Sequence, residues 1–385
     1  MSANEGLSPE DRREAGRFAR EMIRRYGDAM VSILIDLGDR VGLLEAAAQG
    51  PGTSGAIAKR AGLAERPVRE WLSAMAAASI LEYDAATRTF SIRPERAICL
   101  TGDSPLNVAA ASRFVAFGTK NLAEIARSFS DGEGVPPDRF LPEATDLFAD
   151  LSRRRYDAAF VDRYLPRAAG LVGRLREGAR ALDLGCGSGQ VVRILARSFP
   201  RSTFLGIDRS VDAIATAERE TRAEGLDNVE FRVGEASRAS GAFDLVLALD
   251  AIHDQGDPEG FLRAAHRTLV PGGIFLAVEP AASSRLEENL GRPETPYLYG
   301  LSVLYCLPVG LSAGTAGLGT CWGESAAREM LDRVGFVEIE SGPAPLNSMA
   351  TLWLARRSGQ RADPGGPATD PAAGDYRVTG SQGRG

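Results

Sequence analysis

Short apolar runs alternate, from residue 180 to residue 357, with longer segments in which apolar residues recur every three or four positions. The runs predict buried strands, and the longer segments predict amphipathic helices. The predicted strands span residues 182–184, 202–208, 229–233, 243–249, 274–279, 336–340 and 349–355. This alternation indicates an α/β fold, with a doubly wound, Rossmann-like sheet of seven strands between layers of helices.

The pattern is different over residues 41–92, where three helices precede two short alternating strands. Thr53 is placed to cap the second helix, Gly62 to end it, and residues 66–79 form a longer third helix. A polar turn joins the two strands, which span residues 81–83 and 89–92. This order of elements is typical of a winged helix-turn-helix.

Helical patterns at residues 107–130 and 145–176 connect these two regions. Within them Tyr156 and Phe160 recur at helical spacing, which indicates either a packed core or the wall of a ligand pocket. We expect an N-terminal winged-helix-like domain, a helical connector, an α/β domain and a disordered tail, spanning residues 1–100, 101–176, 177–357 and 358–385.

Composition narrows the classes of protein to consider. Of the 385 residues, 44% are hydrophobic and 25% are charged, as is ordinary for a soluble globular protein. The early apolar run at residues 30–37 is interrupted by Ser32 and Asp36 and is too short to span a membrane. Acidic residues near the start of the chain are unlike a signal or transit peptide, so we expect a cytoplasmic protein.

The cysteines lack the spacing of zinc ligands or of a disulfide framework. They are Cys99, Cys186, Cys306 and Cys321. The sequence therefore predicts no metal site.

The segment 182–189 carries the clearest chemical signal, because an apolar strand runs into three alternating glycines and then into a helix. Such a turn lets the backbone approach a ligand closely, and the helix N-terminus favours a polar or anionic group. A dinucleotide fingerprint would need glycine at position 190, where Gln190 stands. Asp208 follows the next strand at the position of a ribose clamp, and Glu235 follows the third strand, where it is expected to face adenine.

This combination resembles the class I S-adenosylmethionine-dependent methyltransferases, in which a D-x-G-x-G-x-G turn and acids after the second and third strands hold the cofactor. The resemblance covers about residues 181–279. It implies S-adenosyl-L-methionine as cofactor. The residues expected to bind it are Asp183, Gly185, Gly187, Gly189, Asp208, Glu235, Ala236 and Asp250.

Methyl transfer to a hydroxyl needs in-line positioning and a base with a pKa near neutrality, and histidine suits that role. His266 lies within a helix remote from the sheet edge, whereas His253 follows the fourth predicted strand. The layout resembles plant-type O-methyltransferases, which implies His253 as general base beside Asp254, with Glu279 orienting it. Alternatively, His253 only hydrogen-bonds its loop. A further alternative is that His253, Asp254 and Glu279 together coordinate an iron ion.

Two features depart from the plant-type pattern. Gln255 replaces the usual tryptophan, and the spacing to Glu279 is two residues shorter. The family's second orienting glutamate has no clear counterpart. An insertion at residues 280–322 is expected to form a lid, and residues 297–308 within it resemble a largely actinobacterial group of winged-helix methyltransferases.

Residues 1–100 contain 14 basic and 14 acidic side chains, and the chain carries a formal net charge of −6, which argues against nucleic-acid binding. The apolar positions of the third helix are more simply a packing face, and the resemblance implies a homodimer formed through this domain. We therefore expect a methyltransferase that acts on a hydroxyl of a small molecule in bacterial secondary metabolism. Carbon or nitrogen methylation, or a ligand-sensing transcription regulator with this fold, are the alternatives.

Overall fold

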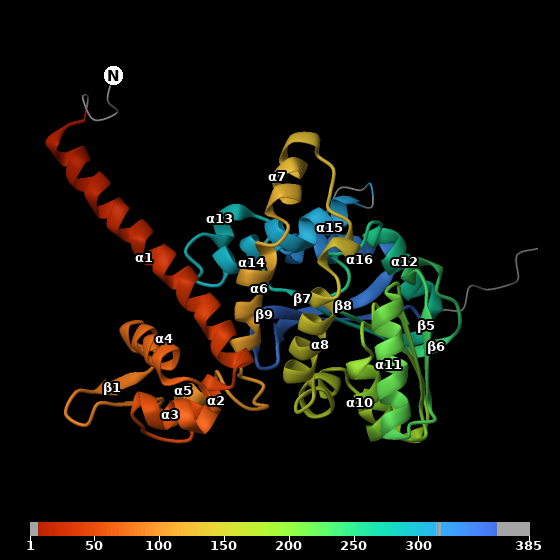
Figure 1. The fold of residues 1–385 in the computed structure, drawn as a ribbon. Coiled ribbons are helices and arrows are strands. Elements are labelled where there is room, and N and C mark those ends of the chain that lie inside the picture. The colour runs from red at the N-terminus through yellow and green to blue at the C-terminus, as the bar shows by residue number, and fades with distance from the viewer. Residues whose placement is uncertain (1–6, 313, 315–316, 360–385) are drawn as a thin grey trace, which may run out of the picture.

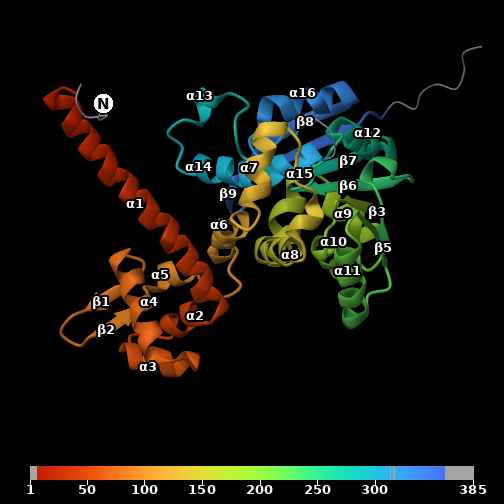
Figure 2. The same ribbon diagram turned by 45° about the horizontal axis from the view of Figure 1, so that its top comes forward.

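The computed structural model describes residues 7–312, 314 and 317–359. Its first element, α1 (Pro9–Arg40), is a 32-residue helix that the sequence analysis did not predict. Ser8 and Asp11 form a capping box at its start. Only its second half packs on the chain, where the Trp71 indole N–H donates to the Leu34 carbonyl oxygen (2.8 Å). The first half projects away from the other described elements in both views (Figures 1 and 2).

The winged-helix pattern is confirmed. Thr53 caps one helix through its hydroxyl, and Gly62 ends that helix with a φ of 69°. Four apolar side chains of the third helix are buried in the core of this region, as expected of a packing face. The elements are α2 (Leu43–Ala48), α3 (Ser54–Ala61), α4 (Glu65–Ala77), β1 (Glu82–Asp84) and β2 (Thr89–Ser91).

The connector is a chain of short helices. Tyr156 and Phe160 are almost fully buried in the core beneath the large sheet, as expected of packed core residues. The elements are α5 (Pro94–Ala97), η1 (Ala109–Ser112), α6 (Arg113–Gly118), α7 (Leu122–Asp131), η2 (Pro137–Phe140), α8 (Glu143–Tyr156), η3 (Phe160–Tyr164), η4 (Leu165–Arg167) and α9 (Leu171–Glu177).

The seven-stranded sheet has the order β5-β4-β3-β6-β7-β9-β8, which confirms the predicted fold class. All strands are parallel except β9, which is antiparallel to both of its neighbours. The strands are β3 (Arg180–Leu184), β4 (Thr203–Asp208), β5 (Val229–Val233), β6 (Phe243–Leu249), β7 (Leu269–Pro280), β8 (Phe336–Ala344) and β9 (Asn347–Arg357). The strand order reverses between β3 and β6, so the carboxyl ends of these strands border a crevice where ligands bind in such sheets.

Helices cover both faces of the sheet, and a separate apolar core lies between each face and its helices. One core contains side chains of α9, α10 (Gln190–Ser198) and α11 (Val211–Glu224), and the other contains side chains of α12 (Pro258–Thr268) and α16 (Glu324–Val334). The β7 strand begins earlier than expected, because Leu269 pairs with Phe243 directly after α12 and the register then shifts between Phe243 and Leu245. Residues 271–273, which precede the predicted strand 274–279, therefore lie inside the observed strand.

The predicted lid is a group of short helices that covers the carboxyl edge of the sheet. It packs on α6, α7 and α8 through a cluster that includes Phe117, Phe140 and Tyr305 (Figure 1). The elements are α13 (Leu286–Asn289), α14 (Thr295–Leu301), the π-helical η6 (Ser302–Cys306) and α15 (Leu307–Ser312). The tail predicted to be disordered lies outside the described residues, apart from residues 358 and 359. Among the described residues, every helix is too short or too polar to span a bilayer.

Candidate active site

The turn after β3 has a backbone that only glycine tolerates. Gly185 and Gly189 have φ values of 77° and 72°, which favour glycine. A Cβ on Gly189 would lie 2.4 Å from the Phe231 ring, and one on Gly185 would lie 2.7 Å from the Cβ of Ala251. At Gly187 the φ is 52° and no atom lies within 4 Å of such a Cβ, so space is open there. The turn is therefore held close to β5 and to the exit of β6, with room beside its middle glycine.

Two carboxylates lie behind this turn. Asp208, at the end of β4, accepts hydrogen bonds from the Gly187 N–H (2.8 Å) and the Ser210 N–H (2.8 Å). A carboxylate accepts about four hydrogen bonds, so Asp208 keeps capacity for ligand hydroxyls. Asp183 is 3% exposed, and its Oδ1 atom has no hydrogen-bond partner among the described residues. Burial, with the nearby charge of Asp208, raises the pKa of Asp183 to about 7.

The exits of β5 and β6 complete this edge. The Gly234 N–H donates to the Asp208 carbonyl oxygen (2.9 Å), which holds the exposed Glu235 and the buried Ala236 beside β4. Asp250 follows β6 with a φ of 53° and forms an ion pair with Arg155, from the end of α8. The structure thus brings all the predicted cofactor-binding residues to one edge of the sheet.

The predicted catalytic residues lie together at the neighbouring strand exits. The His253 Nδ1 atom lies 2.7 Å from Glu279 Oε2, and both side chains are buried. Glu279 also accepts from the backbone N–H groups of Ala251 (3.1 Å) and Ile252 (2.9 Å), and from the indole N–H of Trp322 (3.3 Å). Glu279 therefore fixes the ring so that Nε2 is the atom left for chemistry.

The Nε2 side of the ring faces the lid and the following residue. Asp254 Oδ1 lies 3.4 Å from Nε2, and the thiol of Cys306 in η6 contacts the ring. Burial acts to lower the pKa of His253, but Asp254 and Glu279 outweigh it and raise the pKa well above its ordinary value. Burial, followed by Asp254, raises the pKa of Cys306 to about 11, so its thiol is protonated at neutral pH. Glu279 binds Nδ1 and Asp254 lies at Nε2, so the two carboxylates are at different ring nitrogens. The three side chains therefore do not surround one iron ion, which was an alternative in the sequence analysis.

The sequence analysis missed three residues of this site. Trp322 ends the lid insertion, and its indole N–H donates to Glu279. Arg155 reaches Asp250 from the connector, and Cys306 was noted only as part of the lid. The other histidine, His266, packs edge to face on Phe336 with ring centroids 5.0 Å apart, as fits a structural role.

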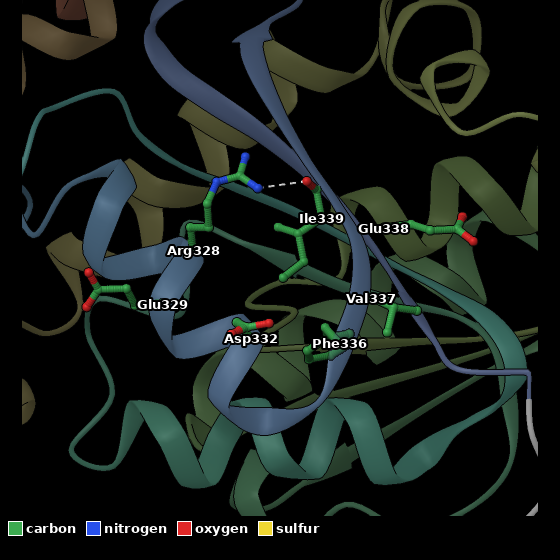
Figure 3. A pocket seen from close by; sticks show the side chains of 7 residues that line it. All are labelled: Arg328, Glu329, Asp332, Phe336, Val337, Glu338 and Ile339. Atoms are coloured by element: carbon green, nitrogen blue, oxygen red, sulfur yellow. Dashed lines mark hydrogen bonds between the residues drawn. The ribbon is translucent and has the colours of Figure 1, made fainter.

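A separate surface depression of about 600 Å³ lies between α16 and the start of β8 (Figure 3). The Arg328 guanidinium crosses it and donates to the Ile339 carbonyl oxygen (2.8 Å). The start of β8 is level with the amino end of β7, whereas Glu279 lies at the carboxyl end. This depression is therefore on the opposite edge of the sheet from the candidate active site.

Comparison with known proteins matches both folded regions to families. Residues 175–312 match the methyltransferase domain family. The chain contains a methyltransferase domain. Residues 29–102 match the Rv2258c-like winged HTH domain. The methyltransferase domain begins just before β3 and, in this match, extends through the lid helices.

Curated relatives of the methyltransferase domain include trans-aconitate 2-methyltransferase of Deinococcus radiodurans, 32% identical over 166 residues, which are 42% of this chain and 59% of the relative. Ubiquinone biosynthesis O-methyltransferase of Methylocella silvestris is 31% identical over 153 residues, which are 38% of this chain and 56% of the relative. The chain thus spans little more than half the length of these curated relatives.

Solved structures match nearly the whole chain. The mitomycin 7-O-methyltransferase MmcR has a TM-score of 0.64 at 19% identity and covers 91% of this chain and 100% of its own. Human N-acetylserotonin methyltransferase, solved with S-adenosylmethionine, has a TM-score of 0.65 at 16% identity and covers 92% of this chain and 99% of its own. At these identities the likeness concerns the fold, in which the winged-helix region and the methyltransferase domain occur together.

The residues present fit S-adenosylmethionine. The unpaired Oδ1 of Asp183 is a buried acceptor that suits a cationic group, such as the α-ammonium of the cofactor. Asp208 has capacity for ribose hydroxyls, and the space at Gly187 leaves room for the ligand. These properties suit a ligand that carries an ammonium and a ribose, in agreement with the predicted cofactor.

Binding of S-adenosylhomocysteine at pH 6 is expected to release a proton from Asp183. Below about pH 7 this carboxyl is mostly protonated, and an ammonium beside it favours the ionised form, so affinity rises with pH up to about 7. Calorimetric titrations at pH 6, in buffers with different ionisation enthalpies, measure the release. The variant Asp183→Asn is the control. Binding that is independent of buffer at pH 6, or an unchanged release in the variant, would refute this assignment.

Proposed function

We propose that the protein transfers the methyl group of S-adenosylmethionine to a hydroxyl of a small molecule, with His253 as general base. The hydrogen bond between His253 Nδ1 and Glu279 Oε2 carries this proposal, because it presents Nε2 at the sheet edge that holds the cofactor-binding residues. Asp183, Gly185, Gly187, Gly189, Asp208, Glu235, Ala236 and Asp250 are the proposed cofactor contacts. Arg155 adds a cation at the same edge that suits the cofactor's carboxylate.

The cofactor supplies an electrophilic methyl group on a sulfonium. His253 takes the proton of the acceptor hydroxyl at Nε2, while Glu279 holds Nδ1–H and stabilises the charged ring. Asp254 and Glu279 favour the protonated ring. Since only neutral histidine accepts a proton, the ring must first release its Nε2 proton before it can serve as the base. The lid excludes water from the buried ring, which strengthens these electrostatic contacts.

The side chains around the lid favour an apolar, aromatic acceptor. Tyr305 directly precedes Cys306, and its ring packs on Phe117, Phe140 and Phe148 with centroids 4.9 to 5.4 Å apart. Aromatic walls of this kind are typical of sites for flat, mostly apolar ligands. Methyltransferases of mitomycin and calicheamicin biosynthesis are among the proteins of similar fold, which supports a role in bacterial secondary metabolism. Because S-adenosylmethionine is a cytoplasmic metabolite, we place the protein in the cytoplasm.

Incubation of the full-length protein with methyl-labelled S-adenosylmethionine and a panel of phenols, followed by mass spectrometry, tests the proposal. We expect a labelled O-methyl product from at least one planar phenol. A label found only on carbon or nitrogen would contradict the O-methyl assignment.

We further propose that residues 1–100 form a homodimer, with residues 101–176 as connector and pocket wall and residues 177–357 as the methyltransferase domain. The support is an exposed apolar stripe on α1 with alternating spacings of three and four residues, which is typical of two helices that pack side by side. The stripe consists of Ile23, Tyr26, Met30, Ile33 and Leu37, which are 38 to 69% exposed. A second copy of the chain packs on this stripe, since the helix projects beyond the rest of the described chain (Figure 2).

Substitution Ile23→Glu is expected to weaken this dimer at least about tenfold, since it places a charge in the packed seam (about 1.4 kcal/mol or more). The neighbouring substitution Arg24→Glu, off the stripe, is the matched control. Light scattering after size-exclusion chromatography should give twice the chain mass of 40.9 kDa for the wild type and the control. A wild-type monomer, or a dimer that Ile23→Glu leaves intact, would contradict the proposal.

A further inference from the structure

Three groups that bind soft or borderline metal ions meet at the Nε2 face of His253. They are an imidazole nitrogen, a carboxylate oxygen of Asp254 and the thiol sulfur of Cys306, and all three ligand atoms lie within 4.8 Å of one another. They come from two elements far apart in the sequence, the exit of β6 and the π-helical η6 of the lid. Cysteine spacing did not predict such a site, since a single cysteine contributes to it.

The separations nearly match a tetrahedral zinc centre. With Zn–N, Zn–O and Zn–S bonds of about 2.0 to 2.3 Å, tetrahedral ligands lie about 3.4 to 3.6 Å apart. His253 Nε2 and Asp254 Oδ1 are already 3.4 Å apart. No two of the three ligand atoms are more than 4.8 Å apart, so a shift of the thiol by about 1 Å at most completes the tetrahedral separations.

The surroundings of the cluster also fit a metal ion. Metal-binding histidines almost always donate their second ring N–H to a carboxylate, and Glu279 takes this position on Nδ1 (2.7 Å). Asp254 Oδ1 is buried without a hydrogen-bond partner in the described part of the chain, although its side chain as a whole is 20% exposed. A cation at this position would replace the ring proton of His253 as the charged partner of Asp254 Oδ1.

We propose that His253, Asp254 and Cys306 form a site for a zinc-class divalent cation, with a fourth position open to water or an anionic ligand. A thiolate, an imidazole and a carboxylate together favour zinc over magnesium or calcium, which prefer oxygen ligands alone. Binding displaces the thiol proton and any proton on Nε2 into solvent, and nothing is oxidised.

The consequence for turnover rests on the proposed function. The cation occupies the Nε2 lone pair that would accept the acceptor's proton, so zinc inhibits methyl transfer. It also links η6 to the exit of β6 and holds the lid closed. Zinc binding itself does not depend on whether the protein is a methyltransferase.

Metal-free full-length protein, titrated with Zn²⁺ against a chromophoric chelator and separately with Co²⁺, tests the site. We expect one ion per chain and a thiolate-to-cobalt charge-transfer band. Cys306→Ser should abolish the band and weaken Zn²⁺ binding at least about tenfold, and Asp254→Asn should weaken it as well. Cys321→Ser, at a half-buried cysteine outside the cluster, is the matched control and should leave both unchanged.

Two results would overturn the site: no stoichiometric binding, or binding that Cys306→Ser leaves unchanged while its circular dichroism spectrum remains native. In the wild type, inhibition of methyl transfer should follow the same Zn²⁺ dependence as binding. Stoichiometric binding without inhibition would overturn the proposed consequence and leave the site standing. Failure of the proposed function would instead be seen as absence of methyl transfer in metal-free protein.

Discussion

Replacement of His253 by alanine is expected to lower kcat for methyl transfer by about 10²- to 10⁴-fold, the usual contribution of a positioned general base. The affinity for S-adenosylhomocysteine should stay unchanged, because the proposed cofactor contacts lie on β3, β4, β5 and the start of the β6 exit. Single-turnover rates at saturating cofactor, on metal-free protein, measure the effect without interference from product release.

The chain offers a matched control in its other histidine. His266→Gln changes a half-buried ring that packs on Phe336 at the far side of α12, so kcat should stay near the wild-type value. If both His253→Ala and His253→Gln kept near-normal turnover with intact cofactor binding, the base assignment would be wrong. Catalysis would then depend on positioning alone.

Substitutions of Glu279 are expected to separate its catalytic role from its structural role. In Glu279→Gln an amide NH₂ replaces one oxygen, so the ring is driven to the tautomer with its proton on Nε2, and kcat should fall about 10²- to 10⁴-fold. Glu279→Ala removes the acceptor for two backbone N–H groups, the His253 ring and the Trp322 indole, all buried. We expect it to lower the free energy of unfolding by about 3 to 5 kcal/mol.

Urea unfolding and single-turnover rates on the same preparations check both effects. Glu287→Gln, at an exposed carboxylate on α13, is the control and should change stability by less than about 0.5 kcal/mol. A Glu279→Gln protein with wild-type kcat would show that the tautomer of His253 has no role in the reaction.

The sheet and its glycine turn were predictable from the sequence because their signals are local. Apolar runs, strand-end acids and the glycines at 185, 187 and 189 each act within a few residues, and parallel strands bring their carboxyl ends to one edge. The pairing of His253 with Glu279 came from the resemblance to plant-type O-methyltransferases, and it agrees with their places after β6 and at the end of the neighbouring β7. Local signals likewise gave the winged-helix elements to within a few residues.

The rest of the site depends on contacts that no local pattern encodes. Arg155 and its partner Asp250 are 95 residues apart in the sequence, and Trp322 is 43 residues from Glu279. The long helix α1 was missed for another reason. Its apolar residues recur at spacings of three and four, but charged residues surround them and Ser32 and Asp36 interrupt the apolar run, so the pattern is weaker than that of a buried helix.

Calorimetric titration of the full-length protein with S-adenosylhomocysteine measures whether this sheet edge binds S-adenosylmethionine. We expect saturable binding of one ligand per chain and no comparable binding of NAD. We also expect at least about tenfold weaker binding in Asp208→Asn, which loses charge-assisted hydrogen bonds to ribose (about 1.5 to 3 kcal/mol each). Folded wild-type protein that does not bind S-adenosylhomocysteine, or equal affinity in Asp208→Asn, would contradict the account.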